Sequence, residues 1–279
     1  MSRLRALTAS VWMGWQRDLG WTNPAGGLAV KTVAPIGSVM TVALIYWLGA
    51  TVAGTFDAER MAFVLVGAAM YSHVAVYSSV QPMAISEGKW TNVFTHVYIS
   101  PGSALPYLAG RCLASFCTSA VTSLVSLLVA YAFVADVLAR HVQVAFTPAS
   151  ALMLAVAMVL NIPGTMGLGF LLGGYTIFAS KFEWALPSYV SGLLMIFSGA
   201  LFPVTMLPWP LSSAAEFLPF TQFIAAARDA LVYGSLSAYL PHLAYALAGG
   251  VLLFALGAAA YRAAEGRGRR LGFIDRKSV

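Results

Sequence analysis

The sequence predicts an all-α integral membrane protein with six transmembrane helices. Of its 279 residues, 59% are hydrophobic and only 9% are charged, whereas soluble domains average about 25% charged residues. Six uncharged runs each exceed the roughly 20 residues that a helix needs to cross a bilayer. None of them alternates like a membrane β-strand, and backbone groups in lipid must be hydrogen-bonded within the segment. These runs are therefore expected to be helices.

The six expected spans follow the gaps between charged residues. They cover about residues 30–53, 61–82, 106–134, 149–179, 186–206 and 239–261. Lys and Arg set the orientation, because cytoplasmic loops of membrane proteins carry an excess of them. With both termini in the cytoplasm, only Arg60, Arg140 and Arg228 lie outside, which leaves 13 of the 16 Lys and Arg inside. We therefore expect a multi-pass protein of the cytoplasmic membrane with both termini cytoplasmic.

The two ends of the chain differ from the membrane domain expected at 25–265. Residues 1–24 place Leu and Trp on one helical arc and Arg on the opposite one, which is typical of an amphipathic helix lying in the membrane interface. The alternative is a solvated lead-in. Residues 266–279 are expected to form a basic cytoplasmic tail. The net charge of +6 then follows from topology, and a nucleic-acid partner, which would need a basic soluble face, is excluded.

The last external loop, residues 199–235, is too apolar for an aqueous loop. Prolines interrupt it every few residues, at Pro203, Pro208, Pro210 and Pro219. Irregular backbone at this depth is tolerated only where it is buried in protein or faces a cavity. The loop is therefore expected to contain two short re-entrant or interfacial helices. A seventh span is excluded because the prolines leave no uninterrupted stretch of helical length.

Residues 85–105 interrupt the apolar pattern between the second and third expected spans. Their topology places them in the cytoplasm, and residues 87–97 are expected to form a short amphipathic helix that ends at Ser100-Pro101-Gly102. Its apolar face comprises Trp90, Val93, Phe94 and Val97. Such a helix between two spans offers a docking surface to a cytoplasmic partner.

Together these features resemble the permease subunits of type-2 ATP-binding-cassette exporters. The cytoplasmic stretch has the order acid, Gly, short amphipathic helix, Ser-Pro and then a basic residue. Residues 198–231 contain Gly-x-x-Phe-Pro, Leu-Pro-Phe-Thr and Ala-x-Arg in the same order as that family. The resemblance covers nearly the whole chain. It implies a separate ATP-binding-cassette ATPase subunit and a second permease copy, as a homodimer or alternatively a heterodimer.

The resemblance also implies which residues contact the ATPase. They are Glu87, Gly88, Lys89, Trp90, Val93, Phe94 and Val97. This chain has no G-x-x-x-x-G-K-[ST] phosphate-binding motif, because Gly88-Lys89 is followed by Trp90 and Met83 stands where the motif needs Gly. ATP and Mg are thus expected on the partner, and this chain is expected to be a transport subunit with no bound cofactor and no catalytic residues. The scattered His and Cys predict no metal site.

Two groups within the spans allow two interpretations each. Met70, His73, Tyr77 and Gln81 share one narrow helical arc, which either lines a transport pathway at the dimer seam or forms hydrogen bonds between helices of one subunit. Asn161, Pro163 and Gly164 interrupt the fourth span. A proline kinks a helix and small residues allow close packing, so this group is either a moving hinge or a packing site.

The apolar and aromatic spans suit the export of a lipophilic or amphipathic molecule, such as a drug-like compound or a lipid. Export of a polysaccharide or glycolipid is the alternative within the same family. No Asp or Glu lies deep in the six expected spans, which disfavours a proton- or sodium-coupled secondary transporter. A membrane enzyme would need clustered His, Asp or Cys. The expected function is therefore the membrane subunit of an ATP-driven exporter.

Overall fold

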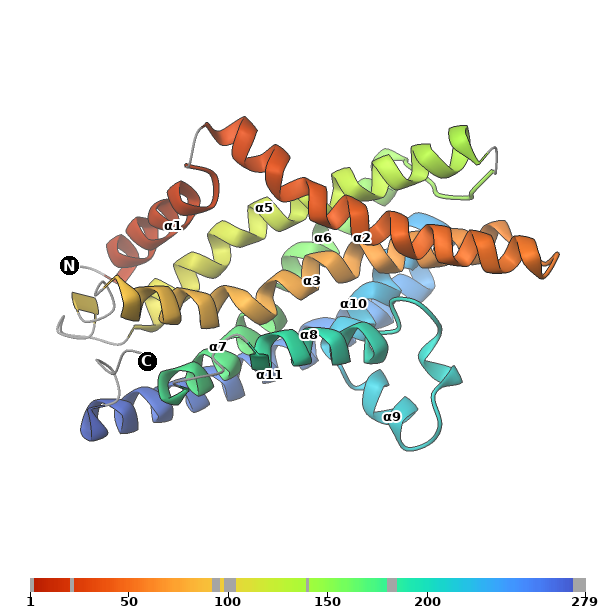
Figure 1. The fold of residues 1–279 in the computed structure, drawn as a ribbon. Helices are drawn as coiled ribbons and strands as arrows, with labels where there is room; N and C mark the ends of the chain where they lie inside the picture. Colours follow the sequence, from red (N-terminus) through yellow and green to blue (C-terminus); the bar gives the residue numbers. More distant parts are fainter. Residues whose placement is uncertain are drawn as a thin grey trace.

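The described part of the chain forms an elongated bundle of helices (Figure 1). The computed structural model describes residues 3–20, 23–91, 96–97, 104–138, 141–179 and 185–272. In chain order the elements are α1 (Arg3–Leu19), α2 (Pro24–Val52), α3 (Ala58–Trp90), α5 (Leu105–Ala132), η1 (Phe133–Val137), α6 (Pro148–Leu160), α7 (Ile162–Phe178), α8 (Ala185–Phe197), η2 (Val204–Met206), α9 (Leu211–Glu216), α10 (Pro219–Arg228), η3 (Asp229–Tyr233) and α11 (Leu236–Leu271).

Five helical segments among the described residues are long and apolar enough to cross a membrane. They are α2, α3, α5 with η1, α6 with α7, and α11. The span expected at 186–206 is shorter than predicted, because α8 has 13 residues and ends at Phe197. Gly199 follows with a φ of +66°, a left-handed conformation that favours glycine and ends a helix. At 1.5 Å per residue, α8 is about 20 Å long, less than the hydrocarbon core.

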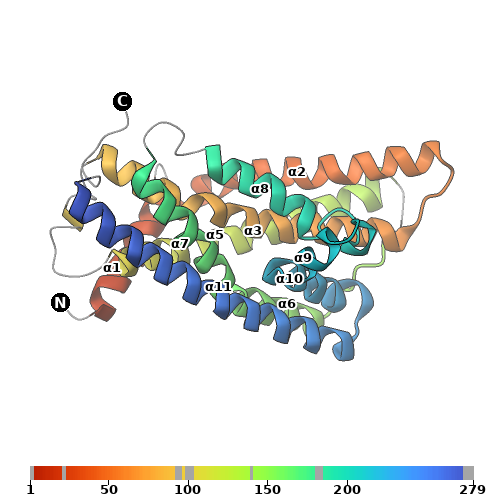
Figure 2. The same cartoon turned by 90° about the horizontal axis from the view of Figure 1, so that it is seen from below.

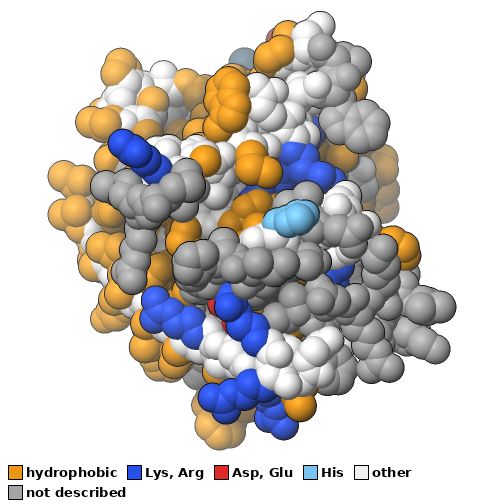
Figure 3. Space-filling view, turned by 90° about the vertical axis from the view of Figure 1, so that its left-hand side faces the viewer, with side chains coloured by type: hydrophobic (Ala, Val, Ile, Leu, Met, Phe, Trp, Pro, Cys, Tyr) orange, Lys and Arg blue, Asp and Glu red, His pale blue; other side chains and the backbone are white. Residues whose placement is uncertain are grey.

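The two ends of the bundle differ in charge. The helix α1, the last turns of α3 and α11 and the first turn of α5 lie at one end, on the left of Figure 1 and Figure 2. Figure 3 looks onto this end and shows Lys and Arg side chains gathered there, with apolar side chains around them. We call it the basic end. The opposite end carries the α2–α3 corner, α9 and α10.

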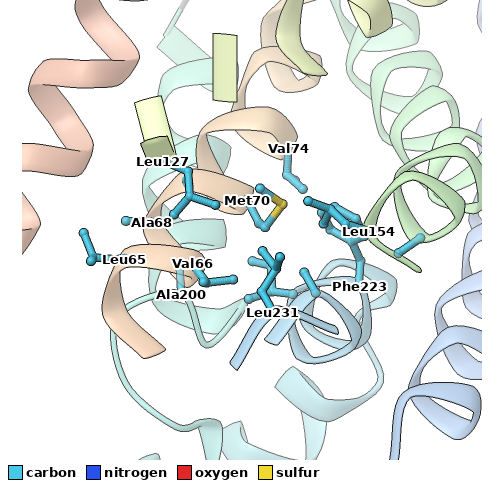
Figure 4. Packing of buried hydrophobic residues seen from close by; sticks show 14 of the residues in the cluster. Leu65, Val66, Ala68, Met70, Val74, Leu127, Leu154, Ala200, Phe223 and Leu231 are labelled. Atoms are coloured by element: carbon cyan, nitrogen blue, oxygen red, sulfur yellow. The ribbon is translucent and has the colours of Figure 1, made fainter. Parts of the chain in front are cut away.

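The central helix is α3, because its buried residues face several neighbours at once. Its N-terminus is capped by Asp57, whose carboxylate accepts a hydrogen bond of 2.9 Å from the backbone N–H of Glu59. In the middle of α3, Met70 has no exposed surface. In Figure 4 it lies among other buried residues of α3, Val66 and Val74, with Leu154 and Phe223 to one side. The core is therefore built around α3.

Glycines on two faces of α7 allow both of its neighbours to approach closely. Facing α11, a Cβ added to Gly167 would lie 2.5 Å from the carbonyl oxygen of Leu253. Facing α3, a Cβ on Gly169 would overlap the side-chain amide of Gln81. Real Cβ atoms do not approach other heavy atoms this closely. Small residues at helix interfaces are the usual route to tight packing in membranes, and here they fix α7 between α3 and α11.

The interruption expected in the fourth span is present. The helix α6 ends at Leu160, Asn161 adopts a turn, and α7 begins at Ile162 with Pro163 in its first turn. Gly164 meets α11, where a Cβ on Gly250 would lie 3.1 Å from the backbone nitrogen of Gly164. The structure therefore contains both a kink and a close packing contact. Movement at the kink remains a prediction.

The loop at 199–235 folds into helices, as the proline spacing suggests. The helix α9 lies at its exposed part, where Trp209 and Phe217 are more than four-fifths exposed. The helix α10 instead returns into the bundle, and it buries Phe220, Phe223 and Ile224 against the core. Only the second of these helices is thus covered by protein.

Arg228 joins three elements at the opposite end. Its Nε donates a hydrogen bond of 3.1 Å to the carbonyl of Phe63 in α3. One terminal nitrogen donates to the carbonyls of Gly199 and Ala200, at 2.8 and 2.9 Å. The guanidinium also lies 3.3 Å from the centre of the Phe63 ring, a cation–π contact. A single buried side chain therefore holds α10, α3 and the turn after α8 together.

Replacing Arg228 with Met is expected to destabilise the protein. The change removes the Arg228 donor from the carbonyls of Gly199 and Ala200, at about 1–3 kcal/mol for each carbonyl left unpaired, although loss of a buried charge offsets part of this. A net loss of about 2 kcal/mol or more is expected in unfolding measurements in detergent micelles. Arg60→Met is the control, because its side chain is 75% exposed and exposed ion pairs contribute about 1 kcal/mol or less. Equal stability of the two variants would contradict this role.

Candidate functional site: a pocket beside α3

A pocket lies between α2, α3 and α8, with α1 and α5 at its base. Its volume is about 780 Å³, and it is partly open. Apolar side chains form its walls, from Pro35 and Val42 on α2 to Met83 on α3 and Met195 on α8. Hydroxyl groups run between these walls, and they belong to Ser38, Tyr71, Ser72, Ser79, Ser115, Thr118, Ser119, Thr122 and Ser191.

Charged side chains from four helices meet at the basic end of this pocket. Glu87 of α3 forms an ion pair with Arg17 of α1, and its other oxygen lies 3.9 Å from Arg111 of α5. Beside it, Lys31 of α2 lies 3.0 Å from Asp18 at the end of α1. All of these charged groups line the pocket. The base of the pocket is therefore polar, and its acids and bases are paired with each other.

Asp18 is held by hydroxyls as well as by Lys31. Its Oδ2 accepts a hydrogen bond of 3.0 Å from Ser115, and Thr118 lies at 3.5 Å. This position results from the packing of α1 against α5, where Gly110 faces Ser10 without room for a side chain. The expected N-terminal helix thus exists over Arg3–Leu19, and it brings polar as well as apolar residues against the bundle.

The arc Met70, His73, Tyr77 and Gln81 lies inside the subunit rather than along the pocket. These side chains are 0–1% exposed, and none of them is among the residues that line the pocket. His73 Nδ1 lies 3.0 Å from the Ser119 hydroxyl, which is also 3.1 Å from the Tyr77 hydroxyl. The placement corrects the pathway interpretation and favours hydrogen bonding between helices of one subunit.

The opposite face of α3 lines the pocket, and the sequence analysis missed it. This face presents Ser72, Val76, Ser79 and Met83. Their spacing of four, three and four residues is that of one helix face. Small hydroxyl residues mixed with apolar ones at this spacing were the available signal. This signal is weak, because a serine in a membrane helix can also hydrogen-bond to the backbone of its own helix. Ser79 does so by donating to the carbonyl of Val76.

The stretch expected to contact an ATPase is in part a continuation of α3. The last turn of α3 contains Glu87, Gly88, Lys89 and Trp90. The expectation of a separate helix beginning at residue 87 is therefore wrong. Gly88 and Lys89 are buried, whereas Trp90 is 59% exposed. Val97 is half-buried and helical. Val93 and Phe94 lie outside the described residues.

A comparison with known proteins gives the family of this chain. A family model described as ABC-2 type transporter matches residues 5–232. No curated protein matches the chain. The matched region includes the pocket, the last turn of α3 and the buried Arg228. The chain belongs to the ABC-2 type transporter family, as a multi-pass membrane component rather than an enzyme.

Proposed function

We propose that this chain is the permease subunit of an ATP-driven exporter that moves a lipophilic or amphipathic molecule, such as a drug-like compound or a lipid. The observation that carries the proposal is the pocket beside α3, with its apolar walls, its hydroxyls and its paired charges at one end. ATP and Mg would bind to a separate ATP-binding-cassette ATPase. A second copy of the chain, or a related permease, would cover the open side of the pocket.

The lining favours an amphipathic molecule over a sugar chain. A volume of about 780 Å³ lies in the range typical of small-molecule sites, which are mostly apolar with a few placed polar groups. A polysaccharide or glycolipid exporter, the second candidate, would need a channel lined by several aromatic rings. Among the described residues that line this pocket, Tyr71 is the only aromatic one.

Filling the pocket tests this function. Ser79→Trp is expected to abolish efflux of a fluorescent lipophilic cation and of a fluorescent phospholipid from cells that express the permease with its ATPase. Leu252→Trp is the control, because Leu252 is 61% exposed on α11, away from the pocket. Both variants should reach wild-type membrane abundance. Unchanged efflux with Ser79→Trp, or equal losses in both variants, would argue against transport through this pocket.

We propose that the basic end lies in the cytoplasm and that the chain crosses the membrane six times. The α8 helix returns the chain toward Gly199, which Arg228 holds at the opposite end, so α8 supplies the remaining passage despite its length. Lys and Arg gathered at one end follow the rule for cytoplasmic faces (Figure 3). Both termini would then be cytoplasmic.

Cysteine labelling tests this orientation. In a variant in which Cys112 and Cys117 are replaced by Ser, Thr55→Cys is expected to react with a membrane-impermeant maleimide added to intact cells. Gly266→Cys is expected to react only after the membrane is permeabilised. Both positions are exposed in the structure. The reverse pattern would show that the orientation is inverted.

The segment from Glu87 to Val97 is proposed to dock on the ATPase. Trp90 exposes an aromatic side chain at the end of α3, and exposed aromatic anchors dominate the binding energy of many interfaces. Trp90→Asp is therefore expected to weaken ATPase co-purification, by about 2 kcal/mol or more if Trp90 is such an anchor. Trp12→Asp, at a similarly exposed tryptophan of α1, is the control. Undiminished co-purification with Trp90→Asp would exclude a docking role for this residue.

A further inference from the structure

Lys89 is buried although it belongs to the segment expected to face a partner. It is 6% exposed, and its ammonium group donates hydrogen bonds of 2.8 and 3.2 Å to the carbonyls of Thr176 and Ile177. These carbonyls belong to the last turn of α7, where a helix has no backbone donors left for them. A cation is also favoured at the negative end of the helix dipole. Lys89 therefore caps α7 from the end of α3.

A second buried charge holds the other end of the same connection. The carboxylate of Glu265 on α11 accepts a hydrogen bond of 3.2 Å from the backbone N–H of Ala104, directly before α5. Glu265 is 4% exposed and also pairs with Arg269 at 2.8 Å. The end of α3 is thus tied to α7, and the residue before α5 is tied to α11.

The two helices that receive these ties are packed as one unit. Gly167 of α7 and Gly257 of α11 leave no room for a Cβ on either side, and Gly164 meets Gly250 farther along the same contact. Contacts of backbone on backbone resist sliding, because packed interiors do not deform continuously. A displacement at either tie would therefore move α7 and α11 together.

We propose that Lys89 and Glu265 are positioning residues that transmit movement of the end of α3 and the start of α5 to the α7–α11 pair. The proposal rests on the proposed function, in which the ATPase moves these helix ends. Glu87, two residues before Lys89, points to the other side and pairs with Arg17 and Arg111. A movement of the last turn of α3 would then pass to two groups of helices. Glu87 would transmit it to α1 and α5, and Lys89 would transmit it to α7.

The test uses the complex of permease and ATPase in lipid nanodiscs, with hydrogen exchange measured with and without ATP plus vanadate. In wild type, nucleotide is expected to change exchange both in the last turn of α7 (residues 173–178) and in α1 (residues 8–19). Lys89→Met is expected to lose the change in α7 and to keep the change in α1. Glu265→Leu, which lies outside the proposed docking segment, should likewise lose the response of α7 and α11 while ATPase co-purification and ATP hydrolysis continue.

Two further variants separate transmission from a merely structural role. Lys89→Arg keeps a charged donor and is expected to restore the response of α7, whereas Arg262→Met removes an exposed cation of α11 and should leave it unchanged. A structural role alone would lower thermal stability while the nucleotide response of α7 persisted. If Lys89→Met does not accumulate, Lys89→Gln replaces it under the same criteria.

The outcomes distinguish this inference from the function on which it rests. A wild-type response of α7 in both Lys89→Met and Glu265→Leu would overturn the transmission role while leaving the exporter intact. Loss of the α1 response together with the α7 response would also overturn it, because the movement would then not be divided at α3. Absence of an ATPase from the purified wild-type permease would contradict the proposed function, and the inference would fall with it.

Discussion

The close approach of α7 to α3 and α11 is the constraint on which the rest of the bundle depends. In a membrane, lipid tails are as apolar as the side chains, so helices associate through tight van der Waals packing and hydrogen bonds rather than through the hydrophobic effect. Glycine on two faces of α7 makes such packing possible with both neighbours. Once these three helices are fixed, one face of α3 is buried and the other is left free to line the pocket with α2 and α8.

The division of α3 into two faces also places polar side chains in the interior of the bundle. The inward face holds His73 and Tyr77, which meet the hydroxyl of Ser119 on α5. Buried polar side chains are tolerated when they find partners, and for the Tyr77 hydroxyl and His73 Nδ1 the partner comes from a neighbouring helix. Ser119 also lines the pocket. Its hydrogen bonds with His73 and Tyr77 therefore connect the interior of the bundle to the pocket wall. A change of shape in the pocket would therefore act directly on the contact between α3 and α5.

Several charges at the basic end are paired between helices, while others, such as Arg262 of α11, are exposed. Partly buried ion pairs add little net stability, because desolvation offsets the attraction, but they fix which helix ends lie side by side. Glu87 contacts α1 and α5, Lys89 contacts α7, and Glu265 contacts the residue before α5. The positions of these helix ends are thus coupled through side chains of both signs.

Much of the fold could be predicted from the sequence because it depends on local composition. Apolar runs of span length, the gathering of Lys and Arg, and prolines spaced through 199–235 each act within a short stretch of chain. They determined the helical class, the long spans and the helices α9 and α10. The order of motifs also identified the family, which the match over residues 5–232 shows. The length of α8 was predicted less well, because the turn at Gly199 is held by the distant Arg228.

The candidate site depended on tertiary structure. Two arcs of α3 are amphipathic enough to face a pathway, one with His73 and Gln81 and the other with Ser72 and Ser79. Only the packing of α5 and α7 decides which arc is buried. Likewise, the sequence shows that Lys89 follows Glu87 by two residues, but not that the two side chains reach different helices. The sequence by itself determined which segments enter the membrane, because transfer into lipid is a property of each segment. The pocket and the charge network were decided by contacts between residues far apart in the chain, because those require the helices to be in place.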